Sequence, residues 1–389
     1  MRAGLASLVA AYVLSQFYRA FLAVLAPVLA RDLGVSPEDL AAASGYWFLG
    51  FALMQVPVGW ALDRIGPRQT VAGLMAVAAL GSAVFAEADG PGLIKVAMAL
   101  IGMGCSAVLM ASYYIFARIY SPAVFGTLAG AMLGIGNLGN IAASVPMSMA
   151  AEALGWRGAL WGLAGVTLAV ALAILIFVRD PVRVAGGNRG SLLDLLRMPA
   201  FWPVLLMMAA CYAPAAGLRG LWIGPYFADV FGADAARMGQ VTLIMGLAMV
   251  AGSFAYGPLD RLFGTRKWVV VAGNSALVVC LLVLWRFPAQ GGVLPTLMFA
   301  GVGLFGSTYP MVMAHGRAFL PAHLVGRGVT LLNLFGLGTA GVVQLITGRL
   351  HAAFPGPPPE APYAALFLFY AALVVAGIAA YLLSKDRAA

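Results

Sequence analysis

The chain has 389 residues, of which 62% are apolar and only 10% are charged. Soluble domains carry about 25% charged residues, so this composition excludes an ordinary water-soluble fold and indicates a chain embedded in the lipid bilayer. The net charge of +9 would favour a nucleic-acid partner in a soluble protein. In a membrane protein it reflects the excess of Lys and Arg in cytoplasmic loops, and we expect no nucleic-acid partner.

Twelve apolar segments follow one another, each long enough to cross a bilayer, which takes about 20 residues. Short polar or Pro- and Gly-containing breaks separate them. The first segment is too long for the apolar core of a signal peptide. The expected helices span 4–30, 40–62, 69–87, 92–118, 123–150, 156–179, 200–228, 235–261, 267–286, 292–319, 325–350 and 361–384.

The cationic residues are unevenly distributed over the two sides of this arrangement. With the N-terminus inside, fifteen of the 23 Lys and Arg residues fall on the cytoplasmic side and six on the opposite side. The other two, Arg19 and Arg219, fall inside helices. The bias follows the positive-inside rule. We therefore predict a multi-pass protein of the cytoplasmic (inner) membrane with both termini in the cytoplasm.

The chain contains an internal repeat. The turn GWALDRIGPR at 59–68 returns as GPLDRLFGTRK at 257–267. Other residues keep an offset between 198 and 202, namely Gly34 with Gly232, Gly102 with Gly301, Arg118 with Arg317, and Gly134, Gly136 and Gly139 with Gly336, Gly338 and Gly341. Parallel six-helix repeats are a known transporter plan. We predict an all-α membrane protein with pseudo-symmetric six-helix bundles at 1–180 and 199–389, and a cytoplasmic linker at 181–198 that contains a short amphipathic helix.

The first copy of the turn resembles the Gly-x-x-x-Asp-Arg-x-Gly-x-Arg loop between helices two and three of the major facilitator superfamily, and Gly155-Trp156-Arg157 is also common there. The second copy departs from the pattern, because Gly257 is one residue too close to Asp260 and Phe263 is inserted before Gly264. The resemblance covers essentially the whole chain. It implies the major facilitator fold with twelve transmembrane helices, and a transporter rather than an enzyme.

The resemblance also implies a role for the turns in gating. In the superfamily the aspartate of this loop helps to latch the cytoplasmic ends of the bundles. The alternative is a solvated loop that only fixes the topology. An ion pair at a partly wet surface contributes about 1 kcal/mol or less, which suits a gate that opens repeatedly. The gating candidates are Asp63, Arg64, Gly66, Arg68, Asp260 and Arg261.

Two arginines interrupt the apolar segments, whereas all fourteen acidic residues fall in loops or at helix ends. Each of Arg19, in helix one, and Arg219, in helix seven, costs about 2.5–3.5 kcal/mol at a helix centre. They are 200 residues apart, which makes them equivalents in the repeat. Guanidinium groups bind carboxylate or phosphate in a bidentate fork, so the pair predicts a small anionic substrate. The arrangement resembles the organophosphate/phosphate antiporters of the superfamily.

The alternative for each arginine is a structural role, with the side chain extended to the membrane surface or bound to carbonyls at a helix break. Pro214, Gly217, Gly220 and Pro225 predict such a break in helix seven. Other polar residues at helical spacing complete the predicted substrate site, although buried amides also serve to join helices. These candidates are Tyr12, Gln16, Tyr212, Trp222, Tyr226, Asn137 and Asn333, with Asn140 and Gln344 on the same faces.

The predicted function is secondary active transport of a small organic or inorganic anion by alternating access, by a monomer with no cofactor and no bound metal. An anion carried alone is driven outward by an inside-negative potential, by about 2.3 kcal/mol per charge per 100 mV. Import therefore requires a counter-anion or co-transported cations. His315, the one histidine in an expected helix interior, is a candidate proton carrier.

Two further functions remain open from the sequence. Export of lipophilic compounds is one, although the absence of an acidic residue from the helix interiors disfavours it. Import of copper is the other, because soft ligands suit Cu(I) and four of them pair at helical spacing: Met207 with Cys211, and Met311 with His315. Methionine also commonly fills cores.

Overall fold

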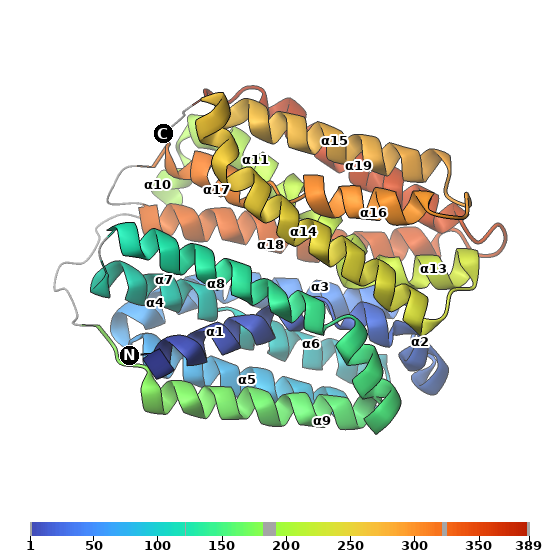
Figure 1. Ribbon diagram of the computed structural model, residues 1–389, viewed down its shortest axis with the longest axis horizontal. Coiled ribbons are helices and arrows are strands. Elements are labelled where there is room, and N and C mark those ends of the chain that lie inside the picture. The colour runs from blue at the N-terminus through green and yellow to red at the C-terminus, as the bar shows by residue number, and fades with distance from the viewer. Residues whose placement is uncertain (1, 121, 182–191, 321–324, 387–389) are drawn as a thin grey trace. The chain divides into compact units, whose positions relative to one another are not determined.

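The computed structural model describes residues 2–120, 122–181, 192–320 and 325–386, and every regular element among them is a helix (Figure 1). The helices form two compact units, Met1–Ala185 and Gly186–Ala389. Helices long enough to satisfy all their backbone hydrogen bonds internally are one of the two structures that cross a bilayer. The all-helical prediction is therefore confirmed for the described residues.

Unit 1 contains nine helices in the described part of the chain. Helix α5 packs against α6 and α9, α3 packs against α6, and α1 packs against α8 (Figure 1). The bounds are α1 Arg2–Phe17, α2 Leu22–Leu33, α3 Pro37–Leu53, α4 Gln55–Arg64, α5 Pro67–Ala86, α6 Pro91–Cys105, α7 Val108–Ile119, α8 Pro122–Ala142 and α9 Val145–Phe177.

Unit 2 follows the same plan with more interruptions. Helix α15 packs against α16 and α19, α14 against α16, and α11 against α18 and α19. The bounds are α10 Leu192–Leu196, η1 Pro199–Phe201, α11 Trp202–Cys211, α12 Ala213–Gly217, η2 Leu218–Trp222, α13 Ile223–Phe231, α14 Ala235–Phe263, α15 Lys267–Arg286, α16 Leu294–Phe305, α17 Tyr309–Arg317, α18 Val325–Ala352 and α19 Ala361–Tyr381.

Ten segments of the described residues are long and apolar enough to cross a membrane, or eleven if α1 and α2, which meet at 50°, are one bent span. The predicted helices at 123–150 and 156–179 fall on α8 and α9. Helix α9 runs through a kink at Gly155, where φ is 71°. The structure therefore bears out a multi-pass bundle, and the count of twelve stays a prediction.

The surface is that of a protein in lipid. Large apolar side chains such as Leu80, Ile176 and Phe254 expose more than half of their area, at 57%, 70% and 66%. Such exposure is unfavourable in water at about 25 cal/mol per Å² of apolar surface. In a bilayer this surface meets hydrocarbon instead.

The repeat is visible in the backbone of the two units. Gly34 ends α2 with φ 62° and Gly232 ends α13 with φ 61°, the left-handed conformation that glycine adopts without a steric cost. Each donates its N–H to the carbonyl four residues earlier, on Ala30 and Ala228. The next helix begins three residues later in both units, with a side-chain cap from Ser36 or Asp234. The two halves therefore share local structure as well as sequence.

Candidate functional site

The predicted break in helix seven is confirmed, and Arg219 lies at its centre. The span Pro199–Phe231 is divided into α11, α12, the π-helical turn η2 and α13. Arg219 is the second residue of η2 and is only 3% exposed. A π-turn is rare and is frequently found at functional sites. The proline and glycines around Arg219 thus produce an irregular helix that surrounds one buried cation.

A glycine on α14 provides the space for this cation. A Cβ atom at Gly246 would lie 2.9 Å from Arg219 Nη2 and 3.2 Å from its Nε. Any larger side chain at this position would collide with the guanidinium. The α14 backbone therefore lies directly against Arg219, and the position of the guanidinium depends on the absence of a side chain at Gly246.

Arg19 lies in a helix break and not in the interior of a helix as predicted. The sequence places it inside helix one, but the structure places it in the break Tyr18–Phe21 between α1 and α2. Its guanidinium carbon lies 5.3 Å from the ring centre of Trp47 and 5.1 Å from that of Phe51, both on α3. Cation–π contacts of this kind are favourable by about 0.5–2 kcal/mol. Arg19 therefore lies just beyond the regular helix that carries Tyr12 and Gln16.

The polar neighbours predicted in unit 1 form two hydrogen-bonded pairs. Gln16 Nε2 donates to Tyr12 Oη at 2.8 Å, and Asn140 Nδ2 donates to Asn137 Oδ1 at 3.1 Å. A Cβ atom at Gly136 would lie 2.2 Å from the Tyr12 ring, so Tyr12 packs closely against α8. The expected helical faces are confirmed for these two pairs. Contact with a substrate stays a prediction.

The polar neighbours predicted in unit 2 are joined through Tyr309, which the sequence reasoning missed. Its ring lies 5.2 Å from that of Tyr212, and its hydroxyl donates to Asn333 Oδ1. Trp222, the last residue of η2, donates from Nε1 to Thr347 Oγ1 at 3.1 Å. These bonds connect the broken helix to α17 and α18.

Tyr226 occupies a different environment. Its ring packs against Phe227, Phe231, Phe299 and other aromatic side chains, with ring centres 5.3–5.6 Å apart. Its hydroxyl donates to the carbonyl of Pro288. The contacts that the structure gives Tyr226 are therefore packing contacts, and its predicted role in substrate binding stays a prediction.

The six gating candidates lie on the turns α4–α5 and α14–α15. Arg64 is exposed at the end of α4. The side chains of Asp63 and Arg261 lie outside the described residues. Three candidates remain: Gly66, Arg68 and Asp260. At each of the two turns a further carboxylate, not predicted from the sequence, binds the start of the next helix.

In unit 1 that carboxylate is Asp180. Its Oδ1 accepts the backbone N–H of Arg68 at 2.7 Å, at the first turn of α5. Gly66 has φ 107°, and a Cβ atom there would lie 2.7 Å from Asp180 Oδ2. The glycine therefore serves both the reversal of the chain and the approach of the carboxylate. Asp180 caps a helix N-terminus, where negative charge is favourable.

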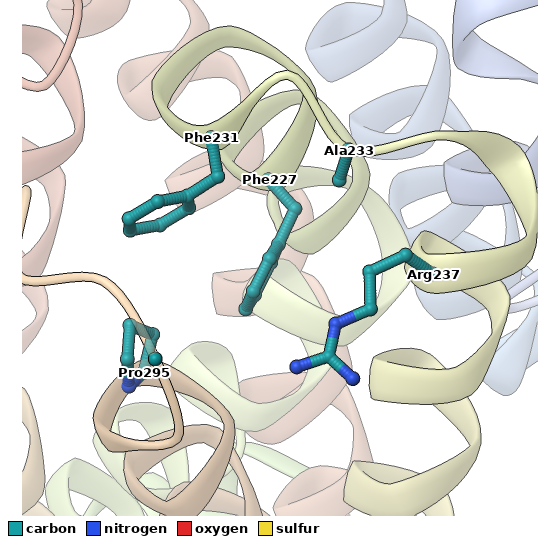
Figure 2. Close-up of a pocket in the computed structure, with 6 residues that line it drawn as sticks. Phe227, Phe231, Ala233, Arg237 and Pro295 are labelled. Carbon is teal, nitrogen blue, oxygen red and sulfur yellow. The ribbon is translucent and has the colours of Figure 1, made fainter.

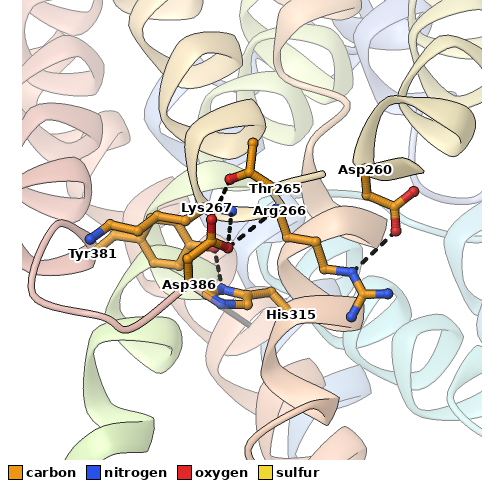
Figure 3. Close-up of polar contacts among 7 residues, drawn as sticks. All are labelled: Asp260, Thr265, Arg266, Lys267, His315, Tyr381 and Asp386. Atoms are coloured by element: carbon orange, nitrogen blue, oxygen red, sulfur yellow. Dashed lines mark hydrogen bonds and ion pairs between the residues drawn. The ribbon is translucent and has the colours of Figure 1, made fainter. Parts of the chain in front are cut away.

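In unit 2 the corresponding carboxylate is Asp386 (Figure 3). One oxygen accepts the hydroxyl of Thr265 at 2.5 Å. The other accepts the backbone N–H groups of Arg266 at 3.3 Å and Lys267 at 3.2 Å. Arg266 Nε also forms an ion pair with Asp260 Oδ2 at 3.2 Å. The turn thus binds both the end of α14 and the C-terminal segment.

The two caps are equivalents in the repeat. Asp180 follows Arg179 after α9, and Asp386 follows Lys385 after α19, 206 residues later. This basic–Asp pair after the last helix of each half is the signal that could have identified them. Burial tends to raise the pKa of Asp386, but the hydrogen bonds from Thr265 and the backbone outweigh it and lower the pKa.

His315 joins two segments in this region, and its predicted role as a proton carrier stays a prediction. Its Nδ1 shares a hydrogen bond with the Tyr381 hydroxyl, and its Nε2 lies 3.1 Å from the Lys385 carbonyl. It therefore fixes the segment that positions Asp386. Met207 and Cys211 are fully buried in the apolar core of unit 2. The contacts of these residues are those of packing and helix joining, which disfavours the copper alternative.

One cavity of about 270 Å³ opens at the opposite end of unit 2 (Figure 2). Its lining comes from the end of α13, the α13–α14 loop, the first turn of α14, the loop before α16 and the first turn of α16: Phe227, Phe231, Ala233, Arg237, Gly292 and Pro295. None of these residues is among the sequence-based candidates. Arg219 does not line it, so the cavity is distinct from the π-turn.

Repeated halves built from membrane-spanning helices, with an interrupted helix that carries a buried charge, are features of secondary transporters. The model of the Major Facilitator Superfamily matches residues 8–344, and the chain belongs to this superfamily. Its members transport solutes and are not enzymes, as the resemblance implied.

Among known proteins, the chain is similar to the gentisate transporter of Corynebacterium glutamicum, with 26% identity over 332 residues, 81% of this chain and 73% of that protein. It is 20% identical to the probable sulfoacetate transporter of Cupriavidus necator over 399 residues, 86% of this chain and 92% of that protein. A solved bacterial homologue of the human lysosomal transporter Spinster, inward-facing and occupied, matches with a TM-score of 0.79 at 16% identity, covering 97% of this chain and 95% of that one. The last comparison shows the fold alone.

The Asp386 cap generates a prediction about stability. Asp386→Ala removes the cap of α15 and should lower the free energy of unfolding by about 1 kcal/mol, the usual cost of losing a helix cap. Because the folded-state pKa is lowered, the difference from wild type should be complete above the unfolded pKa of about 4 and should vanish as the pH falls through the folded pKa. Thermal unfolding in detergent between pH 3 and pH 7 measures it.

The matched control is Asp89→Ala, which removes an exposed carboxylate from the loop between α5 and α6. This variant should unfold like wild type at every pH. Equal melting temperatures for Asp386→Ala and wild type at pH 7 would contradict the capping role.

Proposed function

We propose that this protein is a secondary active transporter of a small organic anion in the cytoplasmic membrane, with both termini in the cytoplasm. The observation that carries the proposal is the buried guanidinium of Arg219 on the π-turn η2, with space made for it by Gly246. A fixed cation at this depth is costly, and an anion bound to it offsets that cost. The two units alternate in opening the site to either side.

Arg19 supplies the second binding group in the proposal. It is the equivalent of Arg219 in the repeat, and both arginines lie where a membrane helix is interrupted. Trp47 and Phe51 bind the face of the Arg19 guanidinium. Its N–H groups point along the plane of the guanidinium, where a carboxylate binds bidentately. Arg19 thus offers an anion the same kind of group as Arg219.

The named relatives favour an organic anion. Gentisate carries an aromatic ring and a carboxylate, and sulfoacetate carries a carboxylate and a sulfonate. A guanidinium fork binds such planar or trigonal oxyanions. The remaining predicted site residues, Tyr12, Gln16, Asn137, Tyr212 and Asn333 among them, orient the anion or join the helices around it. Trp222 couples the π-turn to α18 through Thr347.

The turns act as gates in the same proposal. The ion pair of Asp260 with Arg266 ties the cytoplasmic end of α14 to the start of α15, and the turn of Asp63, Gly66 and Arg68 has the equivalent place in unit 1. Each interaction is weak enough to break in every cycle. The caps Asp180 and Asp386 keep each turn in shape while the gate opens.

Uptake into proteoliposomes tests the substrate site. Gentisate and sulfoacetate are the first substrates to test. Arg219→Gln leaves the bound anion without its cation, which costs at least about 2 kcal/mol of binding free energy. Uptake should therefore fall by about 30-fold or more. Arg219→Lys should retain part of the activity, since it keeps the charge but loses the fork.

Arg286→Gln is the control, because it removes an exposed arginine at the end of α15 and changes the net charge equally. It should transport like wild type. Normal uptake by Arg219→Gln would refute the site. The side on which substrate accumulates also separates import from the alternative, export of a lipophilic compound.

The gate generates a separate prediction. Asp260→Asn weakens the ion pair with Arg266 and should change the maximal rate by about two- to fivefold, the effect of up to 1 kcal/mol, while the KM stays near that of wild type. Initial rates over a range of substrate concentrations measure both quantities. A change in KM with an unchanged maximal rate would instead place Asp260 in substrate binding.

A further inference from the structure

The cavity at the end of α13 combines two aromatic rings with one cation. Phe227 and Phe231 belong to α13, and Arg237 belongs to the first turn of α14. Figure 2 shows the Arg237 side chain extending toward the Phe227 ring, with Pro295 beyond that ring. Apart from Arg237, every lining residue is apolar or glycine. This is the composition of a site for a molecule with an apolar body and one negative group.

The charge of Arg237 is available for such a group. Its backbone N–H is bound by the Asp234 side chain at 2.8 Å, and its Nη2 lies 3.5 Å from Thr296 Oγ1, a long hydrogen bond to a neutral hydroxyl. The ion pairs found among the described residues do not include Arg237. A guanidinium has five N–H donors in a planar fork, so the donors that face the cavity suit a carboxylate.

The size and shape of the cavity set the class of ligand. A volume of about 270 Å³ is slightly below the range of about 300–1,000 Å³ for pockets that bind drug-sized molecules. It therefore suits a small ligand with one ring. Aromatic rings prefer offset or edge-to-face contacts with other rings, which Phe227 and Phe231 offer from two adjacent turns of α13.

The cavity lies at the end of the broken helix. Phe227 follows Arg219 by eight residues along η2 and α13, about 12 Å at 1.5 Å per residue. Tyr226 packs against Phe227 and Phe231 and is four residues from Trp222, the end of the π-turn. A ligand in the cavity thus contacts the same helical segment that carries the buried arginine.

We propose that Arg237, Phe227 and Phe231 form a capture site for an aromatic carboxylate on the outer side of the protein, which delivers the anion to Arg219. The outer location follows from the cytoplasmic N-terminus, because the α13–α14 loop then lies outside. The site selects anions that carry a ring. The inference rests on the proposed anion transport and adds the substrate class.

Gentisate uptake into proteoliposomes tests the capture site. Arg237→Gln should raise the KM about fivefold, because an exposed ion pair contributes up to about 1 kcal/mol, while the maximal rate stays within twofold of wild type. Phe231→Ala should raise the KM by a similar factor. Arg286→Gln, an exposed arginine at the end of the neighbouring helix α15, is the control and should leave the KM unchanged.

Inhibition of uptake by competing anions separates the contribution of the ligand's ring from that of its carboxylate. Benzoate should inhibit wild-type uptake at a concentration at least tenfold lower than acetate, and Phe231→Ala should reduce this ratio. Direct titration of the purified protein with benzoate by calorimetry gives a second readout, in which Arg237→Gln should bind at least fivefold more weakly. An unchanged KM in both variants, or equal benzoate affinity of wild type and Arg237→Gln, would overturn the proposal.

Two further outcomes are informative. If the Arg237→Gln effect appears in vesicles that contain phosphatidylglycerol and disappears in vesicles of phosphatidylethanolamine alone, the guanidinium serves a lipid headgroup and the capture site is refuted. If wild type shows no Arg219-dependent uptake of gentisate or sulfoacetate, the proposed function fails instead. Normal uptake with a KM independent of Arg237 refutes the capture site alone.

Discussion

The cost of keeping a guanidinium inside a membrane-spanning segment shapes unit 2. Arg219 is almost fully buried, and the helix around it is not a regular α-helix but a π-turn between two short α-helices. Gly246 on α14 has no side chain because one would collide with the guanidinium. The helix is thus irregular around a buried charge, and the proposed anion site is built on this charge.

The two halves of the chain use the same types of helix cap at equivalent positions. The caps Gly34 and Gly232 end equivalent helices in the left-handed conformation. Asp180 and Asp386 cap equivalent helix N-termini beside the repeated turn. The arginines differ more, since Arg19 is held by aromatic faces and Arg219 by a glycine-lined position. The two halves are therefore alike in their helix caps and differ in how each buried arginine is held.

The sequence could predict what depends on composition and local pattern. Pro214, Gly217 and Gly220 predict the break at Arg219. The constant separation between equivalent glycines predicts the repeat. The break at Arg19 has no such signal, because the sequence from Ser15 to Leu22 contains neither glycine nor proline; it emerges only from packing against α3. The sequence also predicts one helix at 123–150, whereas the structure divides this range between α8 and the start of α9.

Long-range contacts can be predicted only in part from the sequence. The basic–Asp pair after the last helix of each half marks Asp180 and Asp386, but it does not reveal that each carboxylate binds a helix N-terminus more than a hundred residues away. Tyr309 joins Tyr212 to Asn333 across three helices. The cavity of Phe227 and Arg237 is formed by segments that only the fold brings together. Periodicity finds the faces of helices but not the partners that those faces meet.

The central proposal is that the buried Arg219 binds the transported anion. The most direct test is the equilibrium affinity of gentisate, measured by calorimetry for wild type, Arg219→Gln and the control Arg286→Gln. Loss of the buried guanidinium should weaken binding by about 30-fold or more, whereas Arg286→Gln should bind like wild type. Equal affinity of Arg219→Gln and wild type would contradict the proposal.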